Sequence, residues 1–172
     1  MNRVVFEMGA TQIIKNLHAL KICMNKAKAH AEHNKFDVNK FLDMKLAPDM
    51  LNFTYQIQIL SDNAKGIAAR LSGTPIPVFE DKEKTWEELV TRIDNTINFI
   101  AKFKADDFAG FENAKATFPW NKEMHLKGMD YLTSFAIPNF YFHLTTAYAI
   151  LRTNGVPVGK MDFLGEVNWN KN

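Results

Sequence analysis

The sequence predicts an all-α protein, a four-helix bundle with a small β-hairpin before the last helix. Four segments of the chain place apolar residues at helical spacing and are separated by short or medium connections. Between Ala105 and Met129 that spacing is lost, and two short β-prone runs take its place. The stretch from Asp130 to Gly165 is the most apolar and aromatic part of the chain, so the other helices are expected to surround it.

Length and composition limit the class of protein. A chain of 172 residues suits one domain over residues 1–172, and apolar and charged fractions of 47% and 23% are typical of a globular protein. A net charge of +2 argues against a nucleic-acid partner. The single cysteine, Cys23, excludes an internal disulfide and fits a cytoplasmic protein. The N-terminus lacks signal-peptide features, and the apolar run Phe135–Leu151 is too short for a membrane span.

The first half of the chain contains two of the expected long helices. The first is predicted from about Met8 to His33, and a short helix follows from about Val38 to Met44, with Asp37 as its N-cap. Pro48 suits the first turn of the second long helix, which is expected to end at about Leu71, before Gly73.

The second half contains the other two long helices. Thr85 and Glu88 have the spacing of a capping box, which predicts a third helix ending at about Phe103. Runs 116–120 and 124–127 are expected to pair as a hairpin around a turn at 121–123. The last helix is predicted to start with Asp130 as its N-cap, to bend at Pro138 and to end at Gly155.

Polar residues on the inner faces of these helices form the candidate site. Asn139 and His143 lie four residues apart and share a face of the last helix. Gln58 and Asp62, with Tyr55 one turn before them, are expected to face this pair from the second helix. Buried polar groups usually satisfy one another, so the set is either a structural network or part of a site.

Six segments resemble the domain of unknown function 1993 family, in order and over nearly the whole chain. They are Ala47–Met50, Ala69–Gly73, Pro138–His143, Thr146–Arg152, Asn154–Val156 and Gly159–Gly165. That family is similar to the wider DinB and YfiT group, whose members are four-helix bundles that often form dimers. The resemblance therefore implies a DinB/YfiT-like bundle and a homodimer.

The resemblance also implies a metal site. Many members of the wider group hold a divalent metal on three histidines, and some are thiol-dependent transferases. His143 matches the last of these histidines because Leu151-Arg152 and Gly155 follow it at the group's spacing, while Asn139 and, loosely, Gln58 take the other two positions. Amide oxygens bind zinc or nickel weakly, so we expect no metal unless Asp62 completes the site.

Three hypotheses for function remain. The first is a dimeric protein that binds a small ligand in a polar pocket around His143, lined by Asn139, Gln58, Asp62 and Tyr55. The second is a metal-dependent, thiol-transferase-like enzyme with a degenerate metal site on His143, Asn139 and Gln58. The third is a non-catalytic structural protein. We prefer the first because the polar set persists in an apolar helix yet lacks strong metal ligands.

Overall fold

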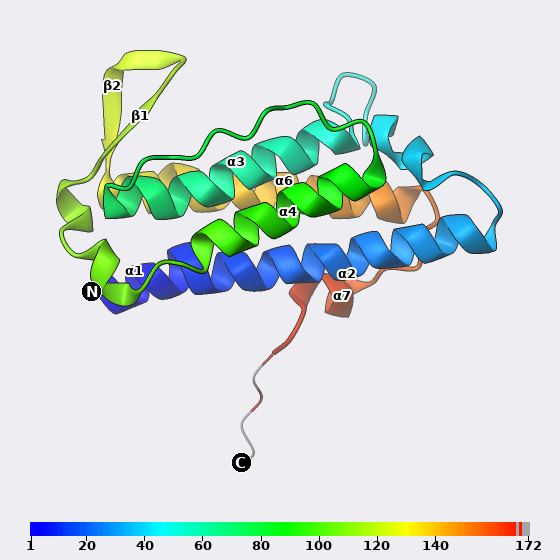
Figure 1. Cartoon of the computed structure of the whole chain (residues 1–172), viewed down its shortest axis with the longest axis horizontal. Helices are drawn as coiled ribbons and strands as arrows, with labels where there is room; N and C mark the ends of the chain where they lie inside the picture. The colour runs from blue at the N-terminus through cyan, green and yellow to red at the C-terminus, as the bar shows by residue number, and fades with distance from the viewer. Residues whose placement is uncertain (168, 170–172) are drawn as a thin grey trace.

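Four long helical segments pack around one apolar core in the computed structural model of the chain, which describes residues 1–167 and 169 (Figure 1). The helices are α1 (Asn2–Phe6), α2 (Gln12–His33), α3 (Phe53–Ser72), α4 (Trp86–Ile100), α5 (Gly128–Asp130), α6 (Ile137–Thr153) and α7 (Lys160–Leu164). The strands β1 (Lys115–Phe118) and β2 (Asn121–Lys127) form an antiparallel hairpin. The predicted fold class, a helical bundle with a hairpin before the last helix, is confirmed.

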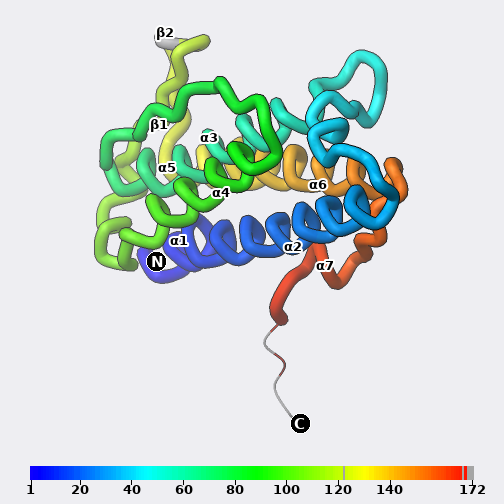
Figure 2. Tube along the Cα trace, turned by 45° about the vertical axis from the view of Figure 1, so that its right-hand side comes forward, coloured from blue at the N-terminus to red at the C-terminus, as the bar shows by residue number. Residues whose placement is uncertain are grey.

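The connections set the order of the helices. Figure 1 shows α3 and α4 running in the same direction, with the segment between them returning across the outside of the bundle. We call this segment, residues 74–85, the strap. Figure 2 shows it as a separate arch over α4 in a second view. A parallel pair of neighbouring helices needs such a long crossover, whereas antiparallel neighbours need only a short turn.

The first long helix begins earlier than predicted. It starts at Asn2, passes through a π-helical turn at Glu7–Thr11 and continues as α2. Val5 is buried and the Phe6 ring packs edge-on against Phe108, with 5.8 Å between ring centroids. These contacts come from a distant segment, which explains why local spacing did not reveal the first turn.

The second long helix begins later than predicted. The side-chain oxygen of Asn52 accepts a hydrogen bond from the backbone N–H of Tyr55 at 3.1 Å, which fixes the start of α3 at Phe53, so the prediction of Pro48 was wrong. Its end is confirmed, because Gly73 takes the left-handed conformation (φ 72°). The expected short helix is a 3₁₀ helix, Val38–Asp43, with Asp37 as its cap.

The capping box that predicts α4 is present. The Thr85 hydroxyl accepts from the Glu88 N–H at 3.2 Å, and the Glu88 carboxylate accepts from the Thr85 N–H at 3.0 Å. The helix ends at Ile100, three residues before the predicted Phe103. Its apolar residues at helical spacing are all buried: Trp86, Leu89, Ile93, Ile97 and Ile100.

The hairpin is confirmed, but its turn lies elsewhere. Phe118 pairs with Asn121, so Pro119 and Trp120 form the turn rather than residues 121–123. Figure 1 shows the hairpin standing away from the end of the bundle.

The last helix starts at Gly128, and Lys127 rather than Asp130 is its N-cap. A Cβ at Gly128 would lie 1.8 Å from the carbonyl oxygen of Phe111, so only glycine fits this entry. A π-helical turn, Tyr131–Ala136, immediately precedes α6 and Pro138. The predicted end is confirmed, since Gly155 has φ 86°.

The tail packs back on the bundle. The Asp162 carboxylate in α7 pairs with Lys26 of α2 at 2.8 Å, and the Phe163 ring lies edge-on to Tyr148. Among the described residues, no helix has the length and apolarity needed to cross a bilayer.

Candidate functional site

The predicted polar set divides between two faces of α3. His143 contacts Gln56, not Gln58, whereas Gln58 and Asp62 point toward α4 and the strap. Side chains two positions apart on a helix point in directions roughly 160° apart, so Gln56 and Gln58 cannot reach the same neighbour. This corrects the expectation that Gln58 and Asp62 face His143 across the bundle.

His143 and Gln56 form a closed pair between α6 and α3. Nδ1 of His143 donates to Oε1 of Gln56 at 2.7 Å, and the Gln56 Nε2 donates to the carbonyl of Leu51 at 3.0 Å. Both side chains are buried, and burial lowers the pKa of His143 below its usual 6.5. The imidazole is therefore neutral at pH 7. Asn139 lies one turn before it and is half-buried.

The residues at this pair do not fit a zinc or nickel ion. His143 is the one strong donor, and the Gln56 oxygen that faces it is already used as a hydrogen-bond acceptor. Nowhere in the described part of the chain do three His, Cys, Asp or Glu side chains gather as a metal site would require.

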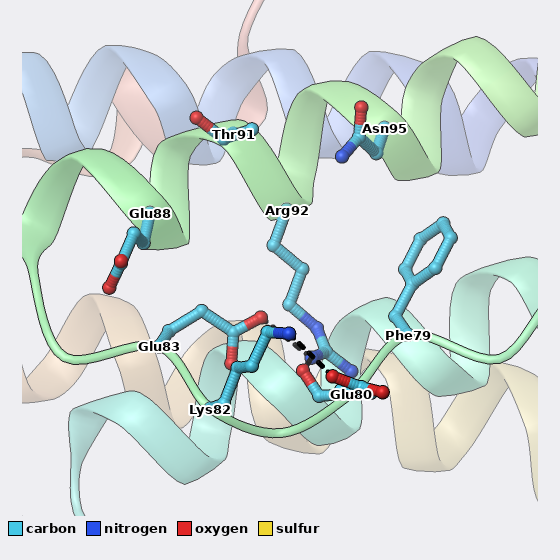
Figure 3. Close-up of a pocket in the computed structure, with 8 residues that line it drawn as sticks. All are labelled: Phe79, Glu80, Lys82, Glu83, Glu88, Thr91, Arg92 and Asn95. Atoms are coloured by element: carbon cyan, nitrogen blue, oxygen red, sulfur yellow. Dashed lines mark hydrogen bonds and ion pairs between the residues drawn. The ribbon is translucent and has the colours of Figure 1, made fainter.

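Arg92 organises the other face of α3. Its guanidinium comes from α4, is 3% exposed, and pairs with Asp62 of α3 at 2.8 Å and with Asp81 and Glu83 of the strap at 2.9 and 2.8 Å. Figure 3 shows the side chain reaching from the helix to the strap, with Glu83 on one side and Phe79 on the other. A buried charge of this kind persists only when it is paired, and here the partners come from three segments.

Lys65 and Phe79 extend this cluster. Lys65 is 3% exposed, pairs with Asp62 at 2.8 Å, and places Nζ 4.1 Å from the centre of the Phe79 ring. The Arg92 guanidinium lies 5.9 Å from the same ring. Arg92 thus holds the strap through its carboxylates and Phe79, whereas Lys65 holds it through the cation–π contact with Phe79 alone.

Gln58 lies beside the cluster with one end unsatisfied. Its Nε2 donates to Glu83 at 2.8 Å, while Oε1 is buried and has no hydrogen-bond partner. Burial alone would raise the pKa of Glu83, but hydrogen bonds from Arg92 and Gln58 outweigh it, and the pKa lies below its usual value. Glu83 is therefore ionised at pH 7.

Two cavities flank the strap. One, of about 300 Å³, lies between the strap and α4 (Figure 3), lined by Phe79, Glu80, Lys82, Glu83, Glu88, Thr91, Arg92 and Asn95. The other, of about 360 Å³, we call the strap cavity. It is lined by Leu42, Asp43, Asn52, Thr54, Tyr55, Gln58, Asp81, Glu83 and Lys84.

The strap cavity contains part of the predicted site. Of the predicted ligand-binding residues it brings together Tyr55 and Gln58, and it leaves out Asp62, Asn139 and His143. His143 lines neither of these two cavities nor any of three others among the described residues.

Sequence reasoning missed Arg92 and Gln56. Arg92 lies three residues after Leu89 and next to Ile93, on the buried face of an amphipathic helix, and a charge at such a position was a usable signal. For Gln56 the only signal is its position one turn after the N-cap of α3. The sequence places the start of this helix too early, at Pro48, so the signal is lost.

These features define a helical bundle of the DinB kind. A crystal structure of a DinB family member protein from Shewanella denitrificans is similar to it, with a TM-score of 0.95 and 37% identity over 99% of this chain and 97% of that one. Residues 5–164 match the family described as Domain of unknown function (DUF1993), and the chain belongs to that family. A search of curated proteins found no match.

Proposed function

We propose that this protein binds a small organic ligand in the strap cavity and uses no metal of its own. The observation that carries the proposal is the Gln58 side chain, which lines the cavity, is 4% exposed and leaves Oε1 without a partner. A buried acceptor without a partner costs about 1–3 kcal/mol, which a donor on a bound ligand offsets. The cavity volume of about 360 Å³ lies in the range of small-molecule sites.

The expected pocket around His143 has weaker support. The imidazole and Gln56 satisfy each other and are buried, and neither side chain lines any of the five cavities found among the described residues. We therefore propose a structural role for this pair, which ties α6 to α3. The thiol-transferase alternative rests on the DinB-like fold, and the donors around His143 do not support it.

Ligand-observed NMR with a mixed library of amines, carboxylates, sugars and nucleosides tests the proposal. Lys84→Trp is the blocking variant, because Lys84 is exposed, lines the strap cavity and leaves the capping box intact when its side chain changes. Lys82→Trp is the matched control, since Lys82 is also exposed on the strap but lines the other cavity.

We expect library members that bind the wild type and the Lys82→Trp variant but not the Lys84→Trp variant. Binding that both variants retain, or a library without any binder, would contradict the proposal.

A cytoplasmic location and a homodimer are further parts of the proposal. The only cysteine is buried, which suits a reducing compartment, and Trp120 and Met124 of the hairpin are 70% and 67% exposed, which suits a contact between subunits. Light scattering on the purified protein tests the dimer, and a monomer at micromolar concentration would contradict it.

A further inference from the structure

The strap cavity has an excess of negative charge. Asp43, Asp81 and Glu83 line it, against one cation, Lys84. Both oxygens of Glu83 are already occupied, one by Arg92 and the other by Gln58. Asp81 uses one oxygen on Arg92, and one oxygen of Asp43 accepts from the Asn52 amide at 3.3 Å. The charges of Asp43 and Asp81 are therefore available to a ligand, since both side chains are exposed.

The hydrogen-bonding groups of the wall are mostly acceptors. The Asn52 amide donates to Asp43, the Thr54 hydroxyl donates to the carbonyl of Leu42 at 3.1 Å, and the Gln58 amide donates to Glu83. These three donors all form hydrogen bonds within the protein, whereas the buried Gln58 oxygen accepts none. A molecule that complements this wall must bring N–H or O–H groups of its own.

Tyr55 adds an aromatic surface. It is 51% exposed on the cavity wall, in the first turn of α3. A ring face next to carboxylates favours a cation, because the quadrupole of the ring and the carboxylate charges act in the same direction. An inorganic metal ion is a poorer fit, since no three His, Cys, Asp or Glu side chains among the described residues, these carboxylates included, lie together as a metal site requires.

We infer that the strap cavity takes a small organic cation that carries several N–H donors, of the alkylammonium or guanidinium class. This inference rests on the proposed function and assigns the ligand class to the same cavity. The N–H groups would donate to the Gln58 oxygen and to the free oxygens of Asp43 and Asp81, and the Tyr55 ring would cover the alkyl chain.

Titration calorimetry at low ionic strength tests the ligand class with a matched pair of probes. The first is 1,4-diaminobutane, a dication, and the second is 1,4-butanediol, which has the same chain length and a hydrogen-bond donor group at each end but no charge. We expect saturable binding of the diamine, and binding of the diol at least roughly tenfold weaker, because the diol lacks the attraction to Asp43 and Asp81.

Asp43→Asn removes one of the two available charges and keeps the shape of the side chain. Asp43 is exposed and accepts a hydrogen bond of 3.3 Å from the Asn52 amide, which an asparagine side chain can also accept, so the variant is expected to fold. We expect it to bind the diamine roughly fivefold more weakly, with a smaller dependence on salt. Asp106→Asn is the control, because Asp106 is an exposed acid on the 3₁₀ turn Ala105–Phe108, outside the cavity, and should bind like the wild type.

Three results would overturn the cation assignment: no saturable diamine binding, equal affinity for the diol, or equal effects of Asp43→Asn and Asp106→Asn. The proposed function fails separately, through the Lys84→Trp experiment. If the diamine does not bind but a neutral ligand binds the wild type and not the Lys84→Trp variant, the strap cavity remains a binding site and only the cation assignment is rejected.

Discussion

The two faces of α3 bury their polar groups in opposite ways. On one face, Gln56 and His143 are neutral, are bonded to each other and lie away from the well-defined cavities. On the other, Arg92 gathers three carboxylates from α3 and the strap, and two cavities flank the strap. A closed neutral pair can fix helix packing but leaves little to recognise, whereas a charged cluster beside open space can hold the strap and contact a ligand. The difference directs functional experiments to Arg92 and the strap.

The largest expected effect comes from Arg92→Met. The variant removes the cation that joins Asp62, Asp81 and Glu83, so these carboxylates repel one another and the strap loses its attachment. We expect the free energy of unfolding to fall by about 3 kcal/mol, at the lower end for a broken buried pair because Asp62 and Asp81 remain partly hydrated. Urea unfolding measures it, with Arg152→Met, at an exposed position, as the control. A loss equal to that of the control would refute the role of the cluster.

A smaller effect is expected at the neutral pair. His143→Leu leaves the Gln56 oxygen buried without a donor and should cost about 1–3 kcal/mol. Adding Gln56→Leu should recover part of that loss, because both polar groups are then gone. A double-mutant cycle by urea unfolding measures the coupling. Strictly additive losses would show that the two side chains do not depend on each other.

The smallest effects are two losses of stability on acidification, which separate the two faces by pH. Burial lowers the pKa of His143, so the unfolded chain binds a proton first and stability falls as the pH drops below about 6.5. The pKa of Glu83 is also lowered, so its contribution is present above pH 4.5 and is lost as the pH falls through its folded value. Unfolding free energies are measured from pH 8 down through the folded pKa of Glu83. The step near neutral pH should be absent in His143→Leu, and the acidic step should be absent in Glu83→Gln. If each variant keeps its step, the assignment of the steps is wrong.

Part of the candidate site was open to prediction from the sequence. Gln58 is predicted as a site residue because an amide near a core needs a partner, and Tyr55 as a possible hydrogen-bond partner of His143; both line the strap cavity, which leaves out His143. His143 was predicted to be buried among polar partners, and it is buried against one, but that partner is Gln56. The error has a geometric cause, because a shift of two residues along a helix moves a side chain to the opposite face.

The sequence by itself determined the helices, the capping box at Thr85, the glycine ends at Gly73 and Gly155 and the presence of the hairpin, because these depend on neighbours within about one turn. The tertiary structure alone decided which face of α3 meets α6 and that the strap folds back on Arg92. It also placed the first turn of the N-terminal helix against Phe108. Those outcomes depend on contacts between segments far apart in the chain, whose geometry local periodicity does not encode.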